Sequence, residues 1–94
     1  MDVNKLGIEL RPTSATPMWE QLASGLAEAI LSGRIEPDTK LPSERELTTL
    51  GVGTSTASRA IGTLRESGLA VESPGRGIFT ARADVIAKAK RAKK

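Results

Sequence analysis

The sequence predicts an α+β fold that is mostly helical, and three observations point to it. The chain has 94 residues, enough for one domain of ordinary size but not for two. Apolar residues recur at helical spacing in three segments between residues 18 and 68, with glycines at the breaks. Two short runs typical of strands then flank a Pro-Gly-Arg-Gly turn at 74–77. We therefore expect three helices followed by a two-stranded hairpin.

Residues 1–16 lack a helical period, and we interpret them as an extended N-terminal arm. The first helix follows, because apolar side chains then recur at helical spacing at Trp19, Leu22, Leu26 and Ile30. Gly33 can adopt the left-handed conformation that ends a helix, which predicts a helix at about 18–32. Trp19 is expected inside the core, since so small a domain needs its one large aromatic there.

A connection with two prolines, residues 34–42, leads to a short second helix. Ser43 and Glu46 have the spacing of a capping box, in which each side chain accepts a hydrogen bond from the other residue's backbone N–H. Gly51 is expected to make the turn that follows. The second helix is therefore predicted to begin after Ser43 and to end before Gly51.

The third helix begins at Thr54 or Ser55, either of which can cap its N-terminus, and it ends at Gly68. Its buried stripe consists of Ala57, Ala60, Ile61 and Leu64. Two helices separated by about four residues, with a glycine at the break, have the spacing of a helix-turn-helix. With strands at 69–73 and 78–80, residues 17–80 are predicted to form a winged helix-turn-helix domain.

Composition excludes several classes of function. The chain contains no Cys and no His, so a thiolate zinc site and His-based catalysis are excluded, and we expect no enzyme activity, metal or cofactor. Aromatic residues make up 2%, too few to stack the bases of a single strand. No apolar run is long enough to span a membrane and no signal peptide follows Met1, so a cytoplasmic protein without membrane contact is expected.

Positive charge is concentrated in a C-terminal tail. Residues 81–94 carry six Lys or Arg and one Asp, whereas residues 17–80 carry six Lys or Arg and eight Asp or Glu. The tail is expected to be helical or disordered, with almost no apolar face, and to attract DNA phosphates regardless of sequence. A solvated tail, or a helix that dimerises the protein through Val85, Ile86 and Ala89, remains an alternative.

Several motifs between residues 17 and 80 occur in a characteristic order. They are the runs Pro17–Leu22, Ile30–Ile35, Lys40–Ser43, Leu41–Leu47, Ser67–Leu69 and Gly75–Gly77. In this order and at nearly these spacings they resemble the DNA-binding domain of the GntR family of bacterial transcription regulators. The resemblance implies a short member of that family without the effector-binding domain that typically follows, and hence no site for a small-molecule effector.

The chain departs from the family pattern at two places before its wing. Three residues separate Leu47 from Gly51, where the family usually has four, so the second helix is expected to be a residue short. The family usually places Arg where this chain has Thr54 and Ser58, and only the neighbouring Arg59 keeps a cation. The resemblance therefore implies an operator sequence different from the usual one.

These features predict sequence-specific binding of double-stranded DNA by a small bacterial, plasmid or phage regulator, most simply a repressor. The third helix would enter the major groove, and the glycines beside Arg76 would let the wing tip approach a flanking groove closely. The expected contact residues are Ser43, Arg45, Thr54, Ser55, Thr56, Ser58, Arg59, Arg76 and Gly77. Because one copy has few cations, a second copy on a repeated or palindromic site is expected.

Each contact has a plainer alternative. The Ser and Thr hydroxyls cap a helix, the wing tip is a solvated turn, and Arg45 pairs with a neighbouring Glu. Arg59 pairs instead with Glu66 or Glu72. Two other classes of function also remain open: a protein-binding winged helix, and an architectural or excision factor that bends DNA.

Overall fold

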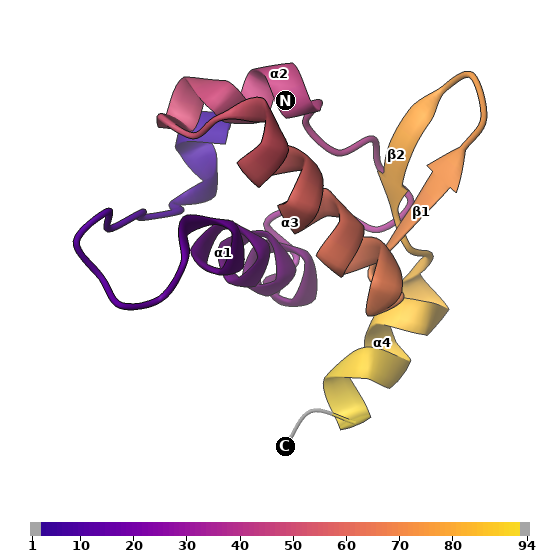
Figure 1. Ribbon diagram of the computed structural model, residues 1–94. Helices are drawn as coiled ribbons and strands as arrows, with labels where there is room; N and C mark the ends of the chain where they lie inside the picture. Colours follow the sequence, from indigo (N-terminus) through magenta and orange to yellow (C-terminus); the bar gives the residue numbers. More distant parts are fainter. Residues whose placement is uncertain (1–2, 93–94) are drawn as a thin grey trace.

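A computed structural model describes residues 3–92 of the chain (Figure 1). Lys93 and Lys94 of the expected tail, and the first two residues of the expected arm, lie outside the described residues. In chain order the elements are the 3-10 helix η1 (Val3–Leu6), α1 (Met18–Ser32), α2 (Glu44–Leu47), the 3-10 helix η2 (Thr48–Leu50), α3 (Thr54–Glu66), β1 (Ala70–Ser73), β2 (Gly77–Thr80) and α4 (Ala83–Ala92). The predicted α+β class, a winged helix-turn-helix, is confirmed.

The core lies between α1 and α3, which pack against each other. α1 covers the range predicted from its apolar period, and Gly33 ends it with a left-handed φ of 88°. The buried stripe of α3 is also the predicted one: Ala57, Ala60, Ile61 and Leu64. Opposite it, α1 buries Leu22, Leu26 and Ile30 almost completely. Burial of each such aliphatic side chain stabilises the fold by roughly 1.5–3 kcal/mol.

α2 is the first helix of the helix-turn-helix, and η2 continues from it into the turn. The Glu46 N–H donates to Ser43 Oγ at 3.1 Å, and the Ser43 N–H donates to Glu46 Oε1 at 2.9 Å, which confirms the capping box. η2 ends at Gly51, whose φ of 94° is left-handed. α2 itself has only four residues. The chain thus turns from α2 into α3 where its sequence predicts.

α3 begins at Thr54, as predicted, but its N-cap residue differs from the prediction. Gly53 occupies the N-cap position with φ −77° and ψ 166°, and no side chain accepts a cap hydrogen bond. The expectation that Thr54 or Ser55 caps the helix is therefore wrong. A cap precedes the first helical residue with extended backbone, and Thr54 is already helical. Neither hydroxyl is used to cap the helix.

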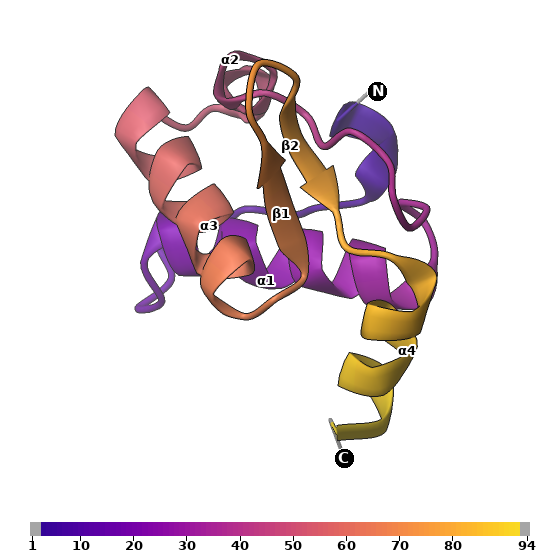
Figure 2. The same cartoon turned by 90° about the vertical axis from the view of Figure 1, so that its right-hand side faces the viewer.

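β1 and β2 pair antiparallel, with Ala70 opposite Thr80 and Ser73 opposite Gly77 (Figure 2). The buried Thr80 fastens the base of this wing, because its hydroxyl donates to the Glu36 carbonyl at 2.7 Å and accepts the Thr39 N–H at 2.8 Å. In both views the wing tip lies at the end of the molecule that carries α2.

The N-terminal segment is not wholly the extended arm that its sequence suggests. Val3–Leu6 form η1, and both Val3 and Leu6 are buried in the core. Residues 7–16 contain no regular helix or strand. A single turn of 3-10 helix has too few residues to show a period in the sequence, so only its tertiary contacts reveal it.

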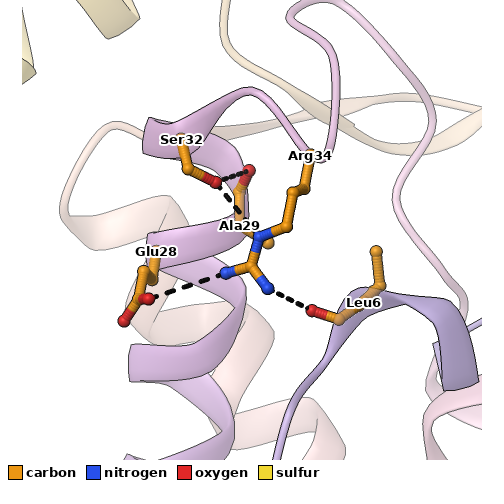
Figure 3. A network of polar contacts seen from close by, with 5 residues as sticks. All are labelled: Leu6, Glu28, Ala29, Ser32 and Arg34. Carbon is orange, nitrogen blue, oxygen red and sulfur yellow. Dashed lines mark hydrogen bonds and ion pairs between the residues drawn. The ribbon is translucent and has the colours of Figure 1, made fainter.

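Arg34 holds this segment against the end of α1 (Figure 3). Its Nη1 donates to the Leu6 carbonyl at 2.6 Å, and its Nε donates to the Ser32 hydroxyl at 3.2 Å. Its Nη2 lies 3.7 Å from a Glu28 carboxylate oxygen. One of the six cations of residues 17–80 is therefore used inside the fold.

The basic tail forms α4, which packs against α1. Ile86 is buried, with 5% of its surface exposed, and Ala89, three residues on, packs against the core. This corrects the expectation that the tail has almost no apolar face. Both views place α4 at the end of the molecule opposite the wing tip.

Candidate nucleic-acid interface

The solvent-facing side of α3 carries most of the residues expected to meet DNA. Thr54, Ser55, Ser58 and Arg59 are exposed, and Thr56 is half-buried. Helical spacing places the four exposed residues on the side away from the buried alanine and leucine stripe. Since Gly53 supplies the N-cap, the hydroxyls near the helix start stay available for a partner.

Arg45 projects from α2 and is exposed. Within residues 3–92 its guanidinium forms no ion pair, so the alternative in which it pairs with a neighbouring Glu is wrong. Ser43 is also exposed, but its oxygen already accepts the Glu46 N–H. The Ser43 hydroxyl can still donate its own hydrogen.

The capping box also sets the charge at the start of α2. The Ser43 backbone N–H donates to the Glu46 carboxylate, and this hydrogen bond lowers the pKa of Glu46 below its ordinary value. Glu46 is therefore a firmly ionised group beside Arg45. The start of α2 is therefore not uniformly positive, because Arg45 lies next to this carboxylate.

A shallow hollow lies between α2 and the wing, and it reveals a cation that sequence reasoning did not single out. Lys40, Arg45 and Gly77 all line it. Lys40 reaches it because it bridges to Phe79 of β2, and a Cβ built on Gly77 would lie 3.1 Å from Lys40 Cε. The sequence signal for Lys40 was its position just before Ser43. Its pairing with β2 is a tertiary contact, which the sequence does not indicate.

The wing tip presents Arg76 to solvent. Gly75 and Gly77 flank it with positive φ values of 77° and 115°, and the Arg76 N–H closes the turn on the Ser73 carbonyl at 2.9 Å. Both glycines adopt backbone conformations that residues with a Cβ disfavour, and these conformations form the turn. The Arg76 side chain forms no ion pair within residues 3–92.

Arg59 lies over an aromatic ring instead of beside an acid. Its Cζ is 4.1 Å from the centroid of the Trp19 ring. The alternative in which Arg59 pairs with Glu66 or Glu72 is wrong, because Arg59 forms no ion pair within residues 3–92 and Glu72 pairs with Arg65 at 3.0 Å. The expectation for Trp19 is wrong too: it is half-buried beside α3 and is not enclosed in the core.

The cations of residues 17–80 therefore separate into two groups. Arg34 and Arg65 are engaged in ion pairs. The others form none within the described part of the chain: Lys40, Arg45, Arg59 and Arg76. These four come from the connection before α2, from α2, from α3 and from the wing. A domain with more acids than bases thus keeps its unpaired cations on the elements that a helix-turn-helix presents to DNA.

Within residues 3–92, no group of three or more Asp and Glu side chains is arranged to hold a metal ion. No helix in that range is long and apolar enough to cross a membrane.

Comparison with known proteins gives a consistent result. The model of the family described as "Bacterial regulatory proteins, gntR family" matches residues 19–80. The chain is 37% identical over 73 residues to the HTH-type transcriptional repressor YtrA of Bacillus subtilis (strain 168). That alignment covers 77% of this chain and 56% of YtrA, so the chain spans little more than half the length of this relative.

Solved structures share the fold. YtrA from Sulfolobus acidocaldarius, a GntR-family transcription factor, is similar with a TM-score of 0.73 and 29% identity, over 90% of this chain and 76% of that one. The AraR DBD in complex with operator ORX1 is similar with a TM-score of 0.69 and 36% identity, over 78% of this chain and 92% of that one.

Proposed function

Because the chain belongs to the gntR family of bacterial regulatory proteins, we propose that it binds double-stranded DNA at a specific operator and represses transcription. The observation that carries the proposal is the set of four unpaired cations on the connection, α2, α3 and the wing. A relative named as a repressor and a similar domain solved with its operator support it. The proposed protein is a small regulator from a bacterium, a plasmid or a phage.

The exposed side of α3 would lie in the major groove. There the Arg59 guanidinium suits a guanine edge or a phosphate, and the hydroxyls of Thr54, Ser55, Thr56 and Ser58 suit either. Arg45 and the Ser43 hydroxyl would meet phosphates at the start of α2, with Lys40 close by. Arg76 and the Gly77 backbone would meet the flanking groove from the wing tip.

One copy offers few cations, so it should bind only modestly. We therefore propose that two copies occupy a repeated or palindromic site, as is usual for helix-turn-helix proteins. The proposal includes no catalytic step and no cofactor, since the chain has neither His nor Cys. It includes no small-molecule effector, and it places the protein in the cytoplasm, where it meets DNA.

The first experiment is selection of bound sequences from random duplex DNA, followed by affinity measurements on the selected operator. Arg45→Ala and Arg59→Ala should each weaken operator binding, by ~1–3 kcal/mol where the side chain reads a base and by less at a lone phosphate. Arg82→Ala is the matched control, because Arg82 is exposed at the start of α4 and pairs only with Asp84 within residues 3–92.

Unchanged affinity in both variants, with native circular dichroism, would contradict the assigned face. Binding that ignores DNA sequence would favour a protein partner instead. A strong bend in the selected duplex would favour an architectural role over simple repression.

A further inference from the structure

The contact between Arg59 and Trp19 joins the exposed side of α3 to the first turn of α1. The Arg59 Cζ lies 4.1 Å from the ring centroid, well within the range of a cation–π interaction. Arg59 is exposed and Trp19 is half-buried, so the ring forms a platform at the rim of the core. The platform carries a cation that the proposed function places against DNA.

The platform is itself held in place. Two residues after Trp19, the Gln21 amide oxygen accepts the Arg11 N–H at 2.7 Å. The Gln21 amide nitrogen donates to the Arg11 carbonyl at 3.0 Å and to the Thr16 carbonyl at 2.7 Å. These bonds fasten the loop that leads into α1. They hold the segment before Trp19 on the helix that carries the ring, and the packing of α1 against α3 places that helix beside Arg59.

Stacking uses one face of the guanidinium and leaves its edge free. All five guanidinium N–H groups point outward in the plane of the group, so a ring stacked on its flat side leaves them free. Within the described residues, the Arg59 guanidinium makes no hydrogen bond and no ion pair, so the ring is its only recorded partner. The stack orders a long side chain without consuming the donors that recognise a guanine edge or a phosphate.

The surface of α3 is also open about one turn beyond Arg59. Gly62 lies three residues after Arg59, and a Cβ built there would meet nothing within 4 Å. Glycine in a helix interior is less stable than alanine, and a Cβ would fit at Gly62. The packing of the fold therefore does not require glycine at this position.

We propose that Trp19 is a positioning residue: its ring holds Arg59 in the orientation that contacts the operator, although Trp19 need not touch DNA. The inference rests on the proposed function and adds a specificity determinant on α1, outside the helix-turn-helix. Preordering reduces the conformational entropy that Arg59 loses on binding. Removing the ring should then weaken binding only through Arg59.

The test is a double-mutant cycle on the selected operator, with Trp19→Leu, Arg59→Gln and the double variant. Trp19→Leu alone should lower operator affinity roughly two- to fivefold, the size of an exposed cation–π contact, and should cause almost no further loss in the Arg59→Gln background. Trp19→Phe, which keeps a ring, should retain more affinity than Trp19→Leu. Trp19→Leu combined with Ser58→Ala is the matched control and should be additive.

A second readout does not require DNA. Trp19 is the only Trp in the chain, so its fluorescence reports on the stack directly. Arg59→Gln should change the emission of the free protein, whereas Ser58→Ala should leave it unchanged. Identical emission in the parent protein and Arg59→Gln would show that no stack forms, and this would overturn the inference.

The outcomes separate this inference from the proposed function. Selective operator binding with additive losses for Trp19→Leu and Arg59→Gln overturns the positioning role alone. A lower Tm in Trp19→Leu, with equal losses for operator and random duplex, likewise assigns Trp19 to the fold only. If the chain selects no duplex at all, the proposed function fails and the positioning role fails with it.

Discussion

The Arg34 guanidinium donates a 2.6 Å hydrogen bond to the Leu6 carbonyl oxygen, joining residues that lie 28 positions apart in the chain. Arg34 directly follows the glycine that ends α1, so this hydrogen bond holds the N-terminal segment against the C-terminal end of α1. Gly25 completes this fit, because a Cβ there would lie 2.9 Å from Ile8 Cγ2. The N-terminal segment is thus part of the packed domain.

Arg34→Ala should therefore lower the free energy of unfolding by about 1 kcal/mol, since it removes a charged donor from a backbone carbonyl at a partly exposed site. Urea denaturation followed by circular dichroism measures the change. Arg82→Ala is the control: its ion pair with Asp84 is 3.5 Å long and both side chains are highly exposed, so its effect should stay below about 0.5 kcal/mol. Equal effects would contradict the structural role of Arg34.

Glu46 should give the fold a pH dependence on the acid side. The hydrogen bond from the Ser43 N–H lowers the pKa of this carboxyl below its ordinary value of 4.5. Because the folded-state pKa is the lower one, the stabilisation is complete above the unfolded-state pKa and disappears as pH falls through the folded-state pKa.

Glu46→Gln should consequently be less stable than the parent at pH 7, and the difference should shrink as the pH is lowered below 4.5. Denaturation curves at several pH values measure this. Glu44→Gln is the matched control, since the capping box uses Glu46 and not its exposed neighbour. Parallel pH profiles for Glu46→Gln and the parent would show that the capping box does not respond to pH.

Local sequence signals were enough to predict α1, the capping box and the wing. Leu22, Leu26 and Ile30 repeat with the period of a helix, Ser43 and Glu46 stand three residues apart, and Gly33 marks a left-handed end. Each signal depends on residues within a few positions of one another. Such signals are carried by the chain before any tertiary contact forms.

Apart from the N-cap of α3, which is a local feature, the features that sequence reasoning missed depend on long-range contacts. Nothing near Leu6 indicates that Arg34 will bond to it, and nothing near Lys40 indicates its bridge to Phe79. The ring beneath Arg59 belongs to Trp19, which lies 40 residues earlier in the chain. The residues on the candidate DNA-facing side of α3 could therefore be predicted from the sequence. The contact of Arg59 with the Trp19 ring on α1 could not.

Two glycines of the helix-turn-helix should respond oppositely to the same substitution. Gly62 lies inside α3 without a positive φ and with open space around its Cβ position, so Gly62→Ala should raise the free energy of unfolding by up to about 1 kcal/mol. Gly68 has a φ of 83°, so Gly68→Ala should lower it by about 1–2 kcal/mol. Thermal or urea unfolding measures both. Stability changes of the same sign would contradict the difference in backbone conformation between Gly62 and Gly68.

The cations of α4 should strengthen DNA binding without making it more specific. α4 lies at the end of the molecule opposite the wing tip, so its charges are not on the face proposed to read the operator (Figures 1 and 2). Deleting the helix is not a clean test, because Ile86 is buried and its loss would disturb the core. A better test substitutes Gln for the exposed cations Lys88, Lys90 and Arg91. These substitutions keep the helix and remove only its charge.

In this triple variant, affinity for operator and for random duplex should fall by the same factor, and the slope of log K against log salt should flatten by no more than about 3 units. Fluorescence anisotropy over a salt series measures both affinities on one protein preparation. Counterion release depends on charge and not on base sequence, so a common factor is the physical expectation. A selective loss of operator binding, together with a change from dimer to monomer in sedimentation, would instead show that α4 organises a second copy on the operator.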